Sequence, residues 1–443
     1  MSPARWRQVA FVFASIFLLV LAASYVGKAV CVDGERDFWA VTRYCYSDIH
    51  VLWGFRGFDV DALPYAGAPA GYVVDYTFEY PPGLGFGSWF MALLTDSRRG
   101  FFALTSVTLA LSGIATFVAT TAVLRREGAS PWWLAGLALS PAVLLFSFQN
   151  WDWWALAPAV IGVAFAHRGK GVAAGVMFGI GAAMKWWPGL LVVLLLAGPW
   201  AAGRDRHDGQ RLKPLAAFIG TALLLQVPAV LVSPRGWLDA HLFHAERSTN
   251  IESGLQGIHD LAGHLWPSSF WDGGFWTIVS VGSVLALSTG LVVIGRRLHQ
   301  GRMAPLDGAL AIVVLFLLTS RVASPQFLLW LIPFAVMARA PWIPVLAVEM
   351  LNAINWILYA PVLAGADRGF TFAAQTVGGM RRVVLGWLLY EVLRRSARPR
   401  PRSESPSIES PAPVAGSGAG DGSGVGADSG AGAAVAPPTA ALS

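Results

Sequence analysis

Charged residues are scarce in this chain of 443 residues, since only 13% are Asp, Glu, Lys or Arg. A soluble domain carries about 25%, and the mean hydropathy here is +0.55. The scarcity therefore excludes an ordinary soluble protein. The net charge is +6, but the basic residues lie in short clusters between apolar runs. That pattern is typical of loops on the cytoplasmic side of a membrane, and it does not indicate nucleic-acid binding.

Cysteine is also rare, and no metal-ligand spacing is present. The two cysteines, Cys31 and Cys45, both follow the first apolar segment. If this region faces an oxidising exterior they can form a disulfide, whereas two free thiols in a loop are the alternative.

Long apolar runs account for most of the chain. The first, 9–27, has about nineteen residues, enough for one membrane span. We expect an uncleaved helix because no signal-peptidase site is evident and many spans follow. Further runs lie at 101–124, 131–149, 151–167, 171–184, 187–201, 213–233, 275–295, 306–320, 325–339, 341–360 and 370–391. The sequence thus predicts an all-α polytopic bundle of about 12 transmembrane helices, and its twenty tryptophans suit two lipid–water interfaces.

Charge orients this bundle in the cell membrane. Placing the large basic clusters inside puts both termini in the cytoplasm, provided that 81–96 lies on or dips into the outer face. If 81–96 spans instead, several basic clusters fall outside. We expect a transmembrane domain over 1–398, with a first outer loop at 28–80 and a second at 234–274. Residues 399–443, rich in Pro, Ser, Gly and Ala, predict a disordered cytoplasmic tail.

This topology gathers the unusual polar residues at the outer face. They are Asp48 and Glu79 in the first loop, Asn150, Asp152 and Lys185 at two turns, His241, His244 and Arg247 in the second loop, and Arg321 and Gln326 at a further turn. Ionisable groups at membrane depth are costly and suggest function. Each also has a structural interpretation: Asp152 and Lys185 can form an ion pair, and Arg321 can extend to the interface.

A transferase that uses a lipid-phosphate sugar needs this set of groups. Asp48 is the candidate base for the acceptor hydroxyl. Lys185, Arg321 and Arg247 are candidates for the donor phosphate. His241, His244 and Gln326 are added to the donor site. The sugar or acceptor pocket is assigned to Tyr46, Trp53, Tyr65, Glu79, Asn150 and Asp152. A transporter or flippase would instead need charges near the midplane and repeated halves, and a catalytically silent membrane subunit is a third possibility.

Four segments resemble glycosyltransferase family 87, the polyprenol-phosphate-mannose-dependent enzymes of the GT-C superfamily. They are YSDIHVLWGFRGFDVDALPY (46–65), EYPPG (79–83), QNWDWW to KWWPGLLVV (149–193) and ASPQFLLWLIP (323–333). The resemblance covers about residues 10–390. It implies a GT-C membrane fold and an inverting transfer of mannose to a glycolipid or polysaccharide hydroxyl, with Asp48 as base. Many members carry a His after the Ser-Pro pair, where this chain has Gln326. That role is therefore lost, or taken by Arg321 or by His241 and His244.

The first loop holds a second acidic pattern. Asp59 and Asp61 form a D-x-D pair, which in sugar transferases can bridge to phosphate through a divalent cation. We rank Asp48 above this pair because it lies among aromatic residues close to the first helix, whereas Asp59 and Asp61 precede Pro64 as in a turn. No cofactor other than the lipid-linked donor is expected, and a divalent cation is the alternative.

Overall fold

A computed structural model describes residues 1–32, 43–67, 78–197, 209–246, 249–250, 253–265, 274–363, 365 and 368–396. The chain divides into two units, Met1–Pro399 and Arg400–Ser443, and the second lies wholly outside the described residues. The disordered tail therefore stays a prediction. In the described part all regular secondary structure is helical.

Five helical segments are long and apolar enough to cross a bilayer by length and composition. They are α1 (Pro3–Ala29), α5 (Arg98–Arg126), α11 with α12 (Gly209–Leu224 and Val227–Val232), α15 (Gly274–His299) and α18 (Trp342–Leu363). About 20 apolar residues suffice for one crossing. The chain is therefore a helical membrane protein, as its composition predicted.

The count of about 12 full spans is not supported. The other apolar runs fold as short helices or 3-10 turns: η2 (Pro131–Leu134), α6 (Ala135–Ala138), α7 (Pro141–Phe146), α8 (Asp152–His167), α9 (Gly171–Met184), η3 (Trp187–Leu191), α10 (Val192–Ala197), α16 (Pro305–Thr319), η6 (Pro325–Trp330) and α17 (Leu331–Met337). Several begin at a proline, which starts a helix readily but cannot continue the preceding one. Within 81–96 the helix is α4 (Pro82–Ala92), whose 11 residues extend only about 17 Å.

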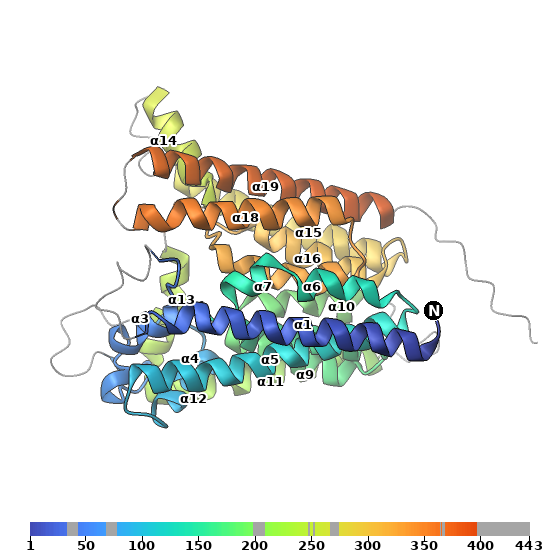
Figure 1. The fold of residues 1–443 in the computed structure, drawn as a ribbon, viewed down its shortest axis with the longest axis horizontal. Coiled ribbons are helices and arrows are strands. Elements are labelled where there is room, and N and C mark those ends of the chain that lie inside the picture. Colours follow the sequence, from blue (N-terminus) through green and yellow to red (C-terminus); the bar gives the residue numbers. More distant parts are fainter. Residues whose placement is uncertain are drawn as a thin grey trace, which may run out of the picture. The chain divides into compact units, whose positions relative to one another are not determined.

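The helices pack side by side, and short segments gather at one end of them (Figure 1). α8 packs between α5 and α9, α9 packs on α11, and α18 pairs with α19 (Arg368–Ser396). α16 and α17 are buried along nearly their whole length. By contrast, only 6% of the apolar windows of α15 and of α11–α12 are buried, which suits helices that face lipid.

The short segments lie at the end of α1 away from the N-terminus (Figure 1). They include α3 (Asp48–Phe55), the turn η1 (Phe58–Val60), α4 and α13 (Pro234–Glu246). α14 (Leu255–Leu265) packs on α19. α3 packs on α5, and α4 packs on both α5 and α9. This arrangement brings the first loop of the sequence against the start of α8 and the end of α9, where the polar residues lie.

Candidate active site

The start of α3 is fastened to the segment that precedes α8. Ser47 is the N-cap of α3: its Oγ accepts a hydrogen bond from the Ile49 amide and donates to the Phe148 carbonyl at 2.7 Å. The amide of Asp48 donates to the Gln149 carbonyl, also at 2.7 Å. Asp48 is thus the first residue of a capped helix that is tied to a second part of the chain. Its carboxylate position follows from both anchors.

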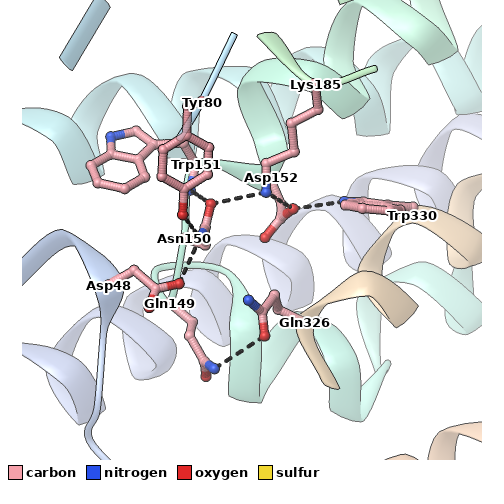
Figure 2. Close-up of polar contacts among 9 residues, drawn as sticks. All are labelled: Asp48, Tyr80, Gln149, Asn150, Trp151, Asp152, Lys185, Gln326 and Trp330. Atoms are coloured by element: carbon pink, nitrogen blue, oxygen red, sulfur yellow. Dashed lines mark hydrogen bonds and ion pairs between the residues drawn. The ribbon is translucent and has the colours of Figure 1, made fainter. Parts of the chain in front are cut away.

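Two neutral groups hold the Asp48 carboxylate. The Tyr46 hydroxyl donates to Oδ1 at 2.7 Å, and the Asn150 amide donates to Oδ2 at 2.6 Å. The same Asn150 amide nitrogen donates to the Tyr80 hydroxyl at 2.9 Å. Asn150 Oδ1 in turn accepts from Lys185 Nζ at 2.9 Å. Asn150 therefore connects the carboxylate to the lysine (Figure 2).

Burial sets the acidity of Asp48. Desolvation disfavours the charged form and raises the pKa of this carboxyl above its ordinary value. Hydrogen bonds from Asn150 and Tyr46, together with the charge of Lys185, lower the pKa and offset part of the rise. The net direction is upward, which makes the ionised carboxylate a stronger base than a solvated one.

Lys185 forms an ion pair with a fully buried carboxylate. Its Nζ lies 2.6 Å from Asp152 Oδ1, and that oxygen also accepts from Trp330 Nε1 at 2.7 Å (Figure 2). Lys185 Nζ lies 5.5 Å from the centre of the Trp330 ring and 5.9 Å from that of Tyr80. The structural ion pair foreseen for Asp152 and Lys185 is therefore present, and it fixes the lysine beside Asn150.

These groups surround a cavity of about 910 Å³. Its wall includes seven predicted site residues: Tyr46, Asp48, Glu79, Asn150, Lys185, Arg321 and Gln326. The cavity thus joins residues from the first loop, the turns before α8 and after α9, and η6 with the segment before it. Glu79 pairs there with Arg56 at 2.7 Å. Gln326 accepts from Gln149 Nε2 at 3.3 Å, and Arg321 Nη1 donates to Ser280 Oγ at 2.8 Å.

Trp53 and Tyr65 do not line the cavity, contrary to expectation. The lining residues of α3 are Asp48, Val51, Leu52 and Phe55, which share one helical face, and Arg56 follows at the C-cap. Trp53 projects from the other face and packs on Phe101, with ring centres 5.0 Å apart.

Tyr65 is buried and supports the site from behind. Its hydroxyl donates to the Tyr80 carbonyl at 2.8 Å. Asp152 likewise is fully buried behind Lys185 rather than on the cavity wall.

His241, the one donor-site histidine of the second loop whose side chain the structure describes, does not line the cavity. His241 Nδ1 lies 2.7 Å from the Trp237 carbonyl, and its ring packs against Trp186 and Trp237. The side chain of His244 and the whole of Arg247 lie outside the described residues, so their donor-binding roles stay predictions.

The D-x-D pair lies apart from the cavity. Asp59 belongs to the turn η1, and Asp61 follows it in the left-handed backbone region at φ 55°. Both are exposed, and neither lines the cavity. Within the ranges that the structure describes, no group of three or more His, Cys, Asp or Glu residues is arranged to hold a metal ion.

Lys28 was missed by sequence reasoning. It is a buried residue in the last turn of α1, and its Nζ donates to the carbonyls of Tyr46 at 2.9 Å and Tyr44 at 3.3 Å. A disulfide joins Cys31 to Cys45, with Cα atoms 6.0 Å apart. The end of α1 thereby anchors the segment that leads into Asp48. The place of Lys28 directly after the first apolar run is that of an ordinary lysine at the end of a span, so the sequence carried no specific signal for it. Arg56, Tyr80 and Gln149 were missed as well, because the contacts that tie them to Glu79, Asn150 and Lys28 join distant parts of the chain.

Fold and site together define a helical membrane protein with a carboxylate and cations in one cavity. The family model of glycosyltransferase family 87 matches residues 78–325, more than half of the chain. The chain therefore belongs to glycosyltransferase family 87 and is a membrane glycosyltransferase, as the resemblance predicted. No curated protein matches it significantly. The matched range includes Glu79, Asn150, Lys185 and Arg321 but begins after Asp48, so the assignment of Asp48 depends on the geometry.

Proposed function

We propose that this glycosyltransferase transfers a hexose, with mannose as the first expectation, from a polyprenyl-phosphate donor to an acceptor hydroxyl with inversion. The acceptor would be a glycolipid or polysaccharide on the extracytoplasmic face of the cell membrane, with both termini in the cytoplasm. The observation that carries the proposal is the cavity that Asp48 shares with Lys185 and Arg321.

Asp48 is the best-placed base. The carboxylates on the cavity wall, within the described ranges, are Asp48 and Glu79. Glu79 is paired with the Arg56 guanidinium, whereas the direct hydrogen-bond donors to Asp48 are the neutral Tyr46 and Asn150. A carboxylate without a guanidinium partner and with a raised pKa is suited to accept a proton from a hydroxyl.

Lys185 and Arg321 supply positive charge for the donor phosphate. Two of the three N–H groups of an ammonium are used by Asn150 and Asp152. The ion pair keeps Lys185 at the cavity wall, and Arg321 lines the same cavity. Cations stabilise the charge that develops on a leaving phosphate.

A groove for the lipid chain begins at Arg321. A second cavity of about 520 Å³ shares Phe316, Ser320 and Arg321 with the first. Its other wall is formed by α15, where Val284 and Leu285 are 64% and 61% exposed. A polyprenyl chain in this apolar groove would have its phosphate next to Arg321.

The chemistry is one displacement. Asp48 takes the proton of the acceptor hydroxyl, and the oxygen of that hydroxyl attacks the anomeric carbon of the donor sugar. The bond from this carbon to the phosphate oxygen breaks, and polyprenyl phosphate leaves with the electron pair. One base and one displacement give inversion, because no glycosyl–enzyme intermediate restores the starting configuration.

The test is transfer by the purified full-length chain. We expect labelled mannose to move from polyprenyl-phosphate mannose to a glycolipid or oligosaccharide acceptor, with the anomeric configuration inverted in the product by NMR. A parallel reaction with polyprenyl-phosphate glucose tests the sugar. Retained configuration would overturn the displacement, and transfer from a sugar nucleotide alone would overturn the lipid-linked donor.

Asn150→Leu is expected to move the acidic limb of the activity–pH profile to higher pH. Asn150 donates a hydrogen bond that lowers the pKa of Asp48, so its loss raises that pKa further. The base acts only when ionised, and activity then falls at a higher pH as the solution is acidified. Gln326→Leu removes an amide from the same cavity that does not contact Asp48, and its acidic limb should not move. If the acidic limb lay at the same pH in both variants, Asn150 would not control the pKa of Asp48.

Transfer is expected to continue undiminished in a chelator. The exposed pair Asp59 and Asp61 lies outside the cavity wall, so a cation held there would be remote from the donor phosphate. The double variant Asp59→Asn with Asp61→Asn should keep full activity, measured with and without added Mg²⁺ or Mn²⁺. The D-x-D hypothesis would be restored if the chelator lowered transfer activity, and if added cation then restored the activity of the native chain but not that of the double variant.

A further inference from the structure

A second cluster of cations lies far from the candidate active site. A cavity of about 630 Å³ is lined by Arg7 of α1, Arg125 and Arg126 of α5, and Arg168 after α8, with Trp6 and Val118 in its apolar wall. We call this the arginine pocket. Trp6 Nε1 donates to the Ala129 carbonyl at 2.9 Å, so the start of α1 is fixed against the end of α5.

The arginine pocket lies at the opposite end of α1 from the candidate active site. Arg7 and Lys28 both belong to α1. Lys28 donates to the carbonyl of Tyr46, which lines the cavity of the candidate active site. Their separation along the helix axis is about 32 Å at 1.5 Å per residue. This is close to the thickness of the hydrocarbon core. A bilayer crossed by α1 would therefore have the arginine pocket at the face opposite the candidate active site.

The charge of the arginine pocket is not neutralised within the described part of the chain. All four arginines are exposed, and none makes an ion pair with a described carboxylate. The nearby Glu127 lies 3.2 Å from both Arg339 and His167. Guanidinium groups bind phosphate oxygens with well-defined geometry.

An apolar stripe leads from the pocket along α5. Val107, Leu111 and Val118 are 57%, 61% and 59% exposed. They follow one another by four and seven residues, and Arg125 follows by seven more, so all four share one helical face. An acyl chain can lie along this stripe while its phosphate contacts the arginines. A soluble phosphate would use the arginines alone.

We propose that the arginine pocket binds the headgroup of an anionic phospholipid in the leaflet opposite the active site. Basic pockets between transmembrane helices select anionic headgroups, and each arginine near the surface adds to the attraction. The lipid would hold the start of α1 against α5. This site is independent of the sugar-transfer chemistry, so it stands or falls separately from the proposed function.

The test is lipid binding to the purified full-length chain in neutral detergent, followed by native mass spectrometry. We expect phosphatidylglycerol to bind in preference to phosphatidylcholine. Arg125→Gln with Arg126→Gln should weaken phosphatidylglycerol binding about tenfold or more, from the attraction per arginine. Soluble glycerol 3-phosphate at the same concentration should not compete. If glycerol 3-phosphate did compete, the ligand of the pocket would be a soluble phosphate and the lipid proposal would be wrong.

A matched control separates a site from general positive charge. Arg296→Gln with Arg302→Gln removes the same charge from two exposed arginines that do not line the pocket. They lie at or just after the end of α15, where the neighbouring Arg297 donates to Leu393 of α19. This variant should bind the lipid within about twofold of the native chain. Equal weakening in both variants would overturn the site.

A further variant keeps the test valid if the α5 substitutions impair folding. Arg7→Gln changes one exposed residue near the chain start, and it should weaken phosphatidylglycerol binding about fivefold. Unchanged binding in this variant, with the same elution volume in gel filtration, would contradict the proposal.

Discussion

Asp48→Asn is expected to lower kcat by about 10²- to 10⁴-fold, the usual contribution of a general base. The substitution keeps the shape of the side chain, and its oxygen can still accept from Tyr46 or Asn150. It removes the ionised oxygen that takes the acceptor proton. KM for the donor should change little because Lys185 and Arg321 remain. The measurement is initial-rate transfer of labelled sugar by the purified protein.

Asp59→Asn is the matched control for this experiment. It makes the same chemical change in the same loop, but at an exposed residue that does not line the cavity. Both variants should unfold at the temperature of the native chain within a few degrees. Full activity of Asp48→Asn, or an equal loss in Asp59→Asn, would remove Asp48 from the role of base.

Lys185→Met is expected to impair both stability and transfer. It leaves the Asp152 carboxylate, which is 0% exposed, without a cation in an apolar interior. Breaking a buried ion pair in this way costs about 3–5 kcal/mol of unfolding free energy. The donor phosphate loses its lysine at the same time. Thermal unfolding in detergent and transfer kinetics measure the two effects.

The double variant Lys185→Met with Asp152→Asn separates these effects. Because no buried charge is left unpaired, we expect stability to return to near the native value. Transfer should stay low, with a raised KM for the donor. Recovery of activity together with stability would show that Lys185 acts only as the partner of Asp152.

The position of Asp48 illustrates how far sequence reasoning reached. Composition and the basic clusters predicted a membrane protein with polar groups gathered on one face, and the structure brings seven of the predicted residues to one cavity wall. Trp53 was misplaced because the side of α3 that faces the cavity depends on its anchors. Those anchors are the contacts of Ser47 and Asp48 with Phe148 and Gln149, about a hundred residues away.

Lys28 shows the same limit from the other side. In the sequence it resembles a basic residue at the end of a span, where a lysine usually extends toward water. In the structure it is buried, and its Nζ donates to the carbonyls of Tyr44 and Tyr46 and to Gln149 Oε1. No local pattern distinguishes the two outcomes, because the difference lies in which carbonyl groups the fold brings within reach.

The sequence by itself determined the class of protein, because hydropathy and charge clustering are local properties that act wherever the chain meets lipid. It also indicated the family, which the family model confirms, and the residue types of the candidate site. The tertiary structure decided which apolar runs form helices long enough for a span and which are broken into short helices, several of them at prolines. It further decided which face of α3 borders the cavity. It also decided that Asn150 connects Asp48 to Lys185. These outcomes depend on packing between segments that are distant in the sequence, as the contacts of Ser47 and Asp48 with Phe148 and Gln149 show for the orientation of α3.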